Sequence, residues 1–130
     1  DNILIFYNFQ SEYDALIEII NPDYEVRGGS SNIPEKEEFT EVRNKTTLVQ
    51  IQAGGTGIEL QYNNLVVFFS PTWSYQDYEQ ALGRAYRNGQ EKKVTVFKFV
   101  TKDTIEEDVY EALTSKKDFT KDMFLKRLGG

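Results

Sequence analysis

The feature that most constrains this chain is a series of short runs with strand character, separated by segments with helical character. The runs lie at residues 3–7, 24–26, 46–51, 65–69 and 94–100. The first and fourth are continuously apolar, as in strands buried on both faces of a parallel sheet. The last run alternates from Val94 to Lys98, which favours a strand nearer a sheet edge. Strands that alternate with helices predict an α/β fold with a mainly parallel sheet.

Helix start signals fall between these runs. Ser11 with Asp14, Ser74 with Asp77 and Thr104 with Glu107 each fit an N-cap residue with an acidic side chain three positions later. Asn21-Pro22 is expected to stop the first helix. The expected helices cover residues 11–20, 35–43, 74–85, 104–113 and 115–128. At 130 residues, positions 1–130 are expected to form one domain. Because the chain begins almost inside its first strand, we expect it to be a fragment of a longer protein.

Composition excludes several classes of function. The chain has no cysteine and no histidine, which removes disulfides, cysteine-based metal sites and the commonest general base. Its net charge of −6 argues against a nucleic-acid clamp that uses the whole surface, although not against a narrow strip of phosphate contacts. No apolar run approaches the length of a membrane span and no leader is recognisable. We therefore expect no metal site within the chain, no membrane contact and a cytoplasmic location.

A glycine-rich stretch follows the third run. Gln52-Ala53-Gly54-Gly55-Thr56-Gly57-Ile58-Glu59-Leu60 comes after the apolar residues Leu48 to Ile51. A strand, a glycine turn and a short helix would together present backbone N–H groups that favour anions. Glycine-rich turns after strands are common, so the stretch alone is a weak signal.

A second stretch carries two arginines, Gln80-Ala81-Leu82-Gly83-Arg84-Ala85-Tyr86-Arg87-Asn88-Gly89-Gln90. The i, i+3 spacing would place Arg84 and Arg87 on one face of a helical turn, and Gly83 would let another chain or a ligand approach closely. Guanidinium groups are planar, permanently charged and suited to phosphate oxygens. The alternative is that the two arginines are solvent-exposed and only form surface ion pairs with nearby carboxylates.

Taken together, these two stretches resemble motifs V and VI of superfamily 2 helicases, in the Snf-type, chromatin-remodeller-like branch. Ile3 to Phe9 is similar to motif IV, Gly28-Gly29-Ser30 to the loop after it, and Thr104-Ile105-Glu106-Glu107 to the family's last helix start. The resemblance implies a three-layer RecA-like domain with helices on both faces of the sheet. It also implies the second lobe of a two-lobe ATP-dependent translocase or helicase. The compact form of the chain points, by resemblance, to a bacterial or phage source.

The resemblance assigns roles residue by residue. It implies Arg87 as the arginine finger toward ATP, with Arg84 as its neighbour. Residues implied near the nucleotide are Gln80, Gly57 and Glu59. Those implied at nucleic acid, expected to be double-stranded DNA, are Gly28, Ser30, Gly54, Gly55, Thr56 and Trp73. ATP and Mg²⁺ would belong to the complete enzyme, held mainly by the N-terminal lobe, and this chain alone would hold neither.

Two positions depart from the family pattern. Tyr86 stands where the family usually has histidine, and Glu59 where it often has asparagine. A carboxylate repels phosphate, so Glu59 is expected to contact a ribose, a metal-bound water or an arginine. The alternative is an exposed glutamate at a helix start. Trp73 has two interpretations as well: a packing anchor between loop and sheet, or a stacking platform for nucleic acid.

Two sequence motifs that ATPases use to bind and hydrolyse ATP are missing from this sequence. It has neither a Gly-x-x-x-x-Gly-Lys-Ser/Thr loop nor an Asp-Glu-x-His box, which supply the phosphate cradle, the Mg²⁺ ligand and the water-activating acid. The chain is therefore expected to be half of an ATPase, inactive in isolation. A non-catalytic RecA-like binding or scaffold module is the alternative, although such a module would not need Gln80 and the two arginines. A doubly wound nucleotide-binding transferase is disfavoured because Asn8-Phe9-Gln10 is not a glycine-rich loop.

Overall fold

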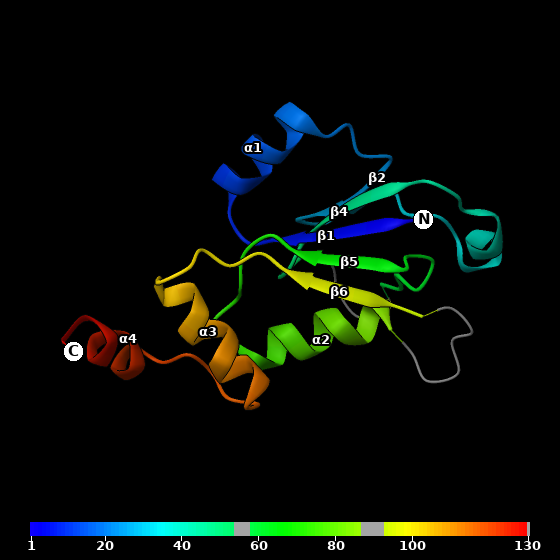
Figure 1. Ribbon diagram of the computed structural model, residues 1–130. Coiled ribbons are helices and arrows are strands. Elements are labelled where there is room, and N and C mark those ends of the chain that lie inside the picture. Colours follow the sequence, from blue (N-terminus) through cyan, green and yellow to red (C-terminus); the bar gives the residue numbers. More distant parts are fainter. Residues whose placement is uncertain (54–57, 87–92, 130) are drawn as a thin grey trace.

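The computed structural model describes residues 1–53, 58–86 and 93–129. They form a six-stranded sheet in the order β3-β2-β4-β1-β5-β6 (Figure 1). The short strand β3 pairs antiparallel with β2, and all other neighbours are parallel. The mainly parallel sheet expected from the sequence is therefore confirmed. The strands are β1 (Ile3–Tyr7), β2 (Tyr24–Arg27), β3 (Ser30–Ser31), β4 (Thr46–Gln50), β5 (Leu65–Phe68) and β6 (Thr95–Lys98).

Helices cover both faces of the sheet. Helix α1 (Gln10–Ile19) lies on one face, and α2 (Tyr75–Ala85) and α3 (Ile105–Thr114) lie on the other (Figure 1). The 3₁₀ helix η1 (Lys36–Glu41) precedes β4, and α4 (Lys121–Gly129) follows α3. The expected three-layer α/β architecture is confirmed.

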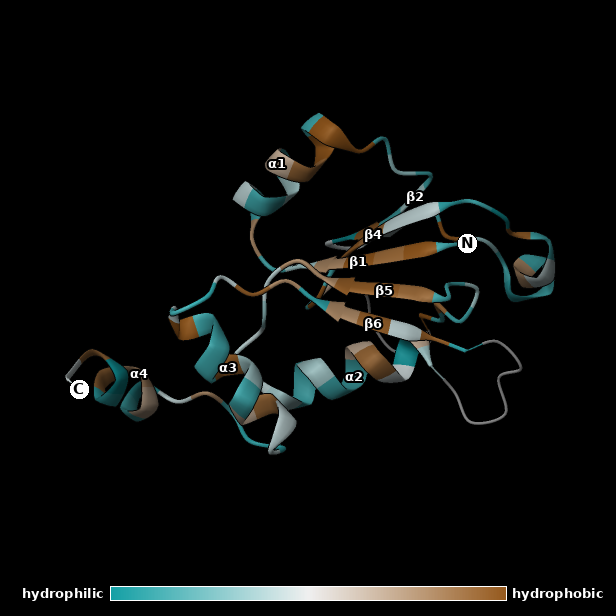
Figure 2. Ribbon diagram, in the orientation of Figure 1, coloured by the Kyte–Doolittle hydropathy of each residue, from teal (hydrophilic) through white to brown (hydrophobic). Residues whose placement is uncertain are grey.

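The central strand β1 explains why both layers form. Leu4 and Phe6 are fully buried in the larger hydrophobic cluster, which includes residues of α2 and α3. Ile5 and Tyr7 point to the opposite face, where they pack with Leu16 of α1. A strand with apolar side chains on both faces is stable only when both faces are removed from water. Figure 2 shows the hydrophobic strands between helices that carry hydrophilic residues.

A buried asparagine holds the amino ends of the strands together. Asn2 is 3% exposed, and its side-chain amide donates to the backbone oxygens of Val42 (2.9 Å) and Tyr62 (2.8 Å). Its side-chain oxygen accepts from the N–H of Lys45 at 3.0 Å. One polar side chain thus satisfies three backbone groups in segments that lead into or out of β4 and β5.

The helix starts follow the sequence signals in two cases out of three. Ser74 Oγ accepts from the N–H of Asp77 (3.2 Å), and Thr104 caps α3 by accepting from the N–H of Glu106 (3.3 Å). The expected Ser11 cap is wrong, because α1 already begins at Gln10. There the carboxylate of Glu12 reaches back to accept from the N–H groups of Asn8 (2.8 Å) and Phe9 (2.9 Å).

The C-terminal helix is shorter than expected, and its start at residue 115 is wrong. Helix α3 ends in a Schellman arrangement: Lys116 has φ +60°, its N–H donates to Leu113 O (3.0 Å), and the N–H of Lys117 donates to Ala112 O (2.9 Å). The following residues then bond to the loop after β5. Asp118 accepts from the N–H of Tyr75 (2.8 Å), and the N–H of Phe119 donates to Trp73 O (2.9 Å).

Three further local expectations need correction. The helix expected at 35–43 is the shorter 3₁₀ helix η1. The helix expected directly after the glycine turn does not form at residues 58–60. The segment expected to be a loop from Gly28-Gly29-Ser30 onward contains β3, which pairs Ser31 with Val26 and Ser30 with Arg27. The edge position expected for the last strand is confirmed for β6.

Candidate nucleotide and nucleic-acid sites

The two stretches singled out in the sequence lie against each other. Gln52 Nε2 lies 3.4 Å from Asp77 Oδ2 in the first turn of α2. The N–H of Leu60 donates to Arg84 O (2.9 Å) in the last turn of the same helix. The glycine-containing segment is therefore tied at both of its described ends to the helix that carries Arg84.

Arg84 makes a third link. Its Nη1 donates to Ala53 O at 3.2 Å, immediately before the glycine stretch. Arg84 is half-buried, and Ala53 is only 5% exposed. A cation in the last helical turn also interacts favourably with the helix dipole. The arginine thus holds the start of the glycine segment.

Helix α2 ends before the second arginine. Ala85 is its last residue, and Tyr86 is the C-cap, with φ −134° and ψ 131°. Tyr86 is extended, so α2 does not continue beyond Ala85. That both arginines share one face stays a prediction, because it depends on the second arginine. Tyr86 is 52% exposed, and its N–H donates to Leu82 O at 2.9 Å. Arg87 lies outside the described residues.

Two residues of α2, Gln80 and Gly83, lie on its solvent-exposed surface. A Cβ built on Gly83 would meet nothing within 4 Å. Glycine inside a helix costs about 1 kcal/mol relative to alanine, and no neighbour among the described residues requires it here. This face can accept the close approach of another chain or a ligand.

Glu59 lies in a polar contact with η1. Its Oε2 is 3.6 Å from Lys36 Nζ, and its side chain is 21% exposed. Ile58, Phe39 and Ser31 line a small hollow of about 280 Å³ beside this pair. Since residues 58–60 are not helical, the interpretation of Glu59 as a helix-start residue is wrong. The remaining stretch, Gly54, Gly55, Thr56 and Gly57, lies outside the described residues.

Gly28 and Ser30 lie in a groove between α1 and the β2–β3 turn. Gly28 has φ +57°, a left-handed conformation that favours glycine. The groove has a volume of about 910 Å³ and includes Tyr13, Arg27 and Gln50. Tyr13 donates its hydroxyl to Glu25 Oε1 at 2.6 Å, and this hydrogen bond raises the pKa of Tyr13. The groove is polar, which suits a charged ligand more than an apolar one.

Trp73 packs against the C-terminal segment. Its ring centroid lies 4.8 Å from that of Phe119 and 5.8 Å from that of Phe124. Trp73 therefore anchors the loop after β5 to the C-terminal segment that contains Phe119 and Phe124, rather than to the sheet. The side chain remains 44% exposed, so one part of the indole is buried and another reaches solvent.

The candidate residues fall at two ends of the sheet. Gly28 and Trp73 follow the carboxyl ends of β2 and β5. Helix α2 runs back toward the amino end of β6 (Figure 1). The backbone of Arg84 therefore lies with Leu60 near that end, while its guanidinium reaches Ala53, just after the carboxyl end of β4. The structure therefore brings Arg84 together with the glycine segment, and it holds Gly28 and Ser30 in a separate site.

Comparison with known families gives a match that covers most of the chain. Residues 1–89 match the model of the helicase conserved C-terminal domain. The chain belongs to the helicase C-terminal domain family. The match begins at β1 and ends within the second stretch, so it spans the glycine segment, Trp73 and both arginines.

Relatives of this helicase C-terminal domain place it in the Snf-type branch. It is 39% identical over 90 residues to Protein CHROMATIN REMODELING 25 of Arabidopsis thaliana, an alignment of 69% of this chain and 9% of that protein. It is 32% identical over 124 residues to ATP-dependent helicase fft3 of Schizosaccharomyces pombe, an alignment of 89% of this chain and 13% of the relative. The chain therefore spans about a tenth of the length of these relatives. Both are eukaryotic, and the expectation of a bacterial or phage source and cytoplasm finds no support.

A solved structure agrees with the fold. The C-terminal part of the Fun30 ATPase domain matches with a TM-score of 0.64 and 29% sequence identity. The match covers 95% of this chain and 42% of the other. The expected RecA-like helicase fold is confirmed.

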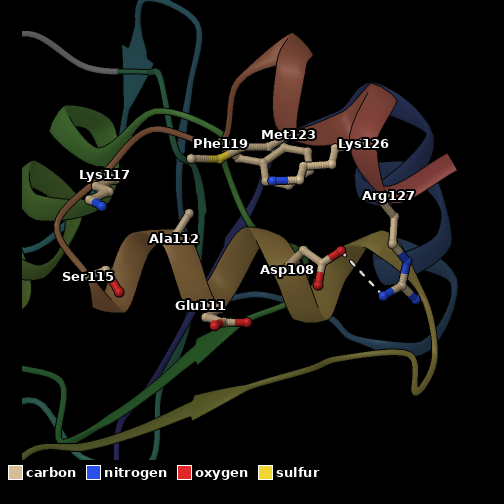
Figure 3. A pocket seen from close by; sticks show the side chains of 9 residues that line it. All are labelled: Asp108, Glu111, Ala112, Ser115, Lys117, Phe119, Met123, Lys126 and Arg127. Atoms are coloured by element: carbon tan, nitrogen blue, oxygen red, sulfur yellow. Dashed lines mark ion pairs between the residues drawn. The ribbon is translucent and has the colours of Figure 1, made fainter. Parts of the chain in front are cut away.

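A further hollow of the helicase C-terminal domain lies outside the matched residues. It has a volume of about 570 Å³, between α3 and α4, with Ala112, Phe119 and Met123 in its wall (Figure 3). Arg127 and Asp108 pair across it at 3.3 Å. None of the residues expected at a site lines this hollow, and no sequence motif pointed to it.

The described residues contain neither a cluster of metal-ligating side chains nor a membrane-spanning helix. Within residues 1–53, 58–86 and 93–129, no group of three or more His, Cys, Asp or Glu side chains could hold a metal ion. None of the helices in the same ranges has the length and apolar character needed to cross a membrane.

Proposed function

We propose that this chain is the second lobe of an ATP-dependent nucleic-acid translocase or helicase, with Arg87 as the arginine finger. Support comes from the family, since relatives of the chain bear names such as ATP-dependent helicase and chromatin-remodeling ATPase. The observation that carries the proposal is the set of contacts between α2 and residues 52–60. It physically joins the proposed nucleotide contacts to the proposed nucleic-acid contacts.

The donor set of the chain fits part of a triphosphate site. Arg84 and Arg87 supply permanent positive charge suited to phosphate oxygens, and exposed Gln80 adds a side-chain amide. ATP with Mg²⁺ would supply the phosphoryl group whose charge these arginines stabilise. The sequence contains no phosphate loop and no acidic box, so the first lobe would hold most of the nucleotide. Gly57 and Glu59 would lie at the margin of the same site.

Nucleic acid would contact the lobe at the glycine segment and around the loops after β2 and β5. Gly54 and Gly55 would bring backbone N–H groups close to phosphate, and Thr56 would offer a hydroxyl. Trp73 would stack through its exposed part. Since Ala53 is bonded to Arg84, a shift of the glycine segment on DNA would move the helix that carries the nucleotide contacts. The expected nucleic acid is double-stranded DNA.

The test is the Arg87→Lys variant in the complete two-lobe protein. Lysine keeps the charge and loses the planar fork, so kcat for phosphate release should fall by about 10³-fold while the nucleotide Kd stays nearly unchanged. Arg43→Lys is the matched control. Arg43 is an exposed arginine before β4, and among the described residues its side chain donates one local hydrogen bond, to the backbone oxygen of the adjacent Val42. A variant with the kcat of the parent protein would favour a non-catalytic binding module.

A further inference from the structure

We infer that the hollow between α3 and α4 docks a short acidic segment of a partner protein, with one apolar side chain of that segment inside the hollow. The hollow is lined by residues between positions 108 and 127, outside residues 1–89 that match the family model. None of the residues assigned to nucleotide or nucleic acid lines it. The inference is therefore independent of the proposed arginine finger and of the proposed nucleic-acid contacts.

Three apolar side chains form one part of the wall of the hollow. Ala112 and Phe119 are buried, whereas Met123 is exposed. Figure 3 shows Ala112 on α3 directed toward Phe119 and Met123. The volume of about 570 Å³ lies within the range of about 300–1,000 Å³ typical of pockets that take small ligands. The hollow can therefore take one leucine or phenylalanine side chain, which is stabilised when its apolar surface leaves water.

Helix α4 has few contacts that hold it in place. Among residues 121–129, Phe124 alone is partly buried, and Arg127 adds the ion pair to Asp108. Leu125 and Leu128 stay exposed to water. Isolated helices shorter than about 12–15 residues are marginal in water, and α4 has nine residues. A partner segment laid along α4 would bury apolar surface that the described residues leave uncovered.

The C-terminal segment has a charge opposite to that of the whole chain. Residues 115–130 carry five basic and two acidic side chains, a net charge of +3, within a chain whose net charge is −6. Two of these basic residues, Lys117 and Lys126, line the hollow and form no ion pair with any described carboxylate. A segment with carboxylates on both sides of its apolar residue would complement the two lysines.

The acidic residues in the wall do not cancel this positive charge. Asp108 is already paired with Arg127 at 3.3 Å. Glu111 lies on the other side of the α3 ribbon from Phe119 and Met123 in Figure 3. Of the charged wall residues that no ion pair between described residues includes, two are lysines and one is a glutamate.

A protein segment fits this site better than nucleic acid does. Nucleic acid would place phosphates against the lysines, but its backbone offers no apolar side chain to the wall formed by Ala112, Phe119 and Met123. A neutral or basic peptide would fill the hollow and leave the lysines without a counter-charge. Protein interfaces combine an apolar anchor in a pocket with polar and charged groups at the rim. An acidic segment with one apolar anchor meets both requirements.

The experiment measures fluorescence anisotropy of labelled synthetic peptides with the 130-residue chain. Each peptide has one leucine or phenylalanine at its centre, flanked by aspartates, by asparagines or by lysines. The aspartate peptides should bind about 5- to 10-fold more tightly than the asparagine peptides at low salt, and this difference should shrink as the salt concentration rises. The lysine peptides should bind more weakly than the asparagine peptides.

Variants of the chain separate charge from apolar contact. Lys126→Glu should weaken the aspartate peptides about 5- to 10-fold and lower their salt dependence, whereas Lys121→Glu, on α4 but outside the hollow, should have a much smaller effect. Met123→Ala should weaken the aspartate and asparagine peptides alike, about 3- to 5-fold, without changing the salt dependence. Its control is Leu128→Ala, which changes an exposed residue outside the hollow and should leave the affinity unchanged. If Lys126→Glu lowers the Tm, Lys117→Glu replaces it as the charge variant.

Three results would overturn the inference. They are no binding of any aspartate peptide, equal affinities for the aspartate, asparagine and lysine peptides, or the parent affinity in both the charge variant and Met123→Ala. Displacement of the aspartate peptide by duplex DNA, together with no effect of Met123→Ala, would assign the lysines to nucleic acid instead. Hydrogen exchange locates the contact: the aspartate peptide should slow exchange in residues 105–129 and leave residues 10–53 unchanged, and the reverse pattern would contradict the proposed site.

Discussion

Substitution of Asn2 by alanine should destabilise the domain more than any comparable change of a surface asparagine. The side chain of Asn2 is buried and makes three hydrogen bonds to backbone groups. One of them fixes the carbonyl of Tyr62, just after the glycine segment rejoins the body of the domain at Leu60. The variant therefore tests whether this segment is held by the amino ends of the strands as well as by α2.

The magnitude follows from the groups left without a partner. Alanine leaves the carbonyls of Val42 and Tyr62 and the N–H of Lys45 unsatisfied. Each buried unsatisfied group costs about 1–3 kcal/mol, and water can reach part of this region through the cavity left by the amide. We expect a loss of about 3–4 kcal/mol in the free energy of unfolding. That is a large share of the 5–15 kcal/mol typical of a whole domain.

The assay is urea unfolding followed by circular dichroism, which gives both the midpoint and the m value. Asn32→Ala is the graded control, since this exposed side chain accepts one hydrogen bond, from the N–H of Glu25 at 2.6 Å. The control should lose about 1 kcal/mol or less. A loss below about 1 kcal/mol for Asn2→Ala, or equal losses for the two variants, would refute the argument.

Three further predictions concern Arg84, Trp73 and Tyr62. Arg84→Ala should cost about 1–2 kcal/mol and speed hydrogen exchange at the amide of Leu60, because the charged bond to the glycine segment is lost; unchanged exchange there would contradict this. Trp73→Ala should expose residues 118–129 to limited proteolysis through loss of the Phe119 and Phe124 contacts, whereas Trp73→Phe should largely protect them. Burial raises the pKa of Tyr62 to about 12, so its stabilising contribution is complete below pH 10 and is lost as pH rises through 12. Tyr62→Phe should therefore reduce the fall in unfolding free energy between pH 10 and 12 by about 2–3 kcal/mol, and an identical fall would argue against a buried, protonated hydroxyl.

The sheet could be predicted from the sequence because its strands are marked by burial on both faces. Ile3–Tyr7 and Leu65–Phe69 read as central strands, and β1 and β5 are indeed interior. The expected edge strand was also correct, since β6 ends the strand order, although its residues are exposed on both faces rather than on one. What failed were features set by tertiary hydrogen bonds. The residues after α3 favour a helix locally, yet Asp118 and Phe119 bond to the loop after β5 instead.

The sequence pattern singled out the candidate residues, but it did not reveal the contacts that Arg84 makes. Spacing alone suggested that Arg84 and Arg87 share a helical face, but the helix ends at Ala85 because Tyr86 turns to an extended conformation. Sequence could not show that Arg84 holds Ala53, since a bond to a backbone carbonyl leaves no residue-type signal. The stacking of Arg27 on Tyr13 was missed for a related reason, since the two residues lie fourteen positions apart on different elements.

The central claim is that this chain is half of an ATPase and contributes Arg87 to a nucleotide held by another lobe. The most direct measurement is phosphate release by the chain alone, by the first lobe alone and by the two joined in one polypeptide, each with and without duplex DNA. We predict negligible release by either half and DNA-stimulated release by the joined protein, abolished by Arg87→Ala. Turnover by the isolated chain that disappears in Arg87→Ala, or full turnover by the joined Arg87→Ala protein, would contradict the account.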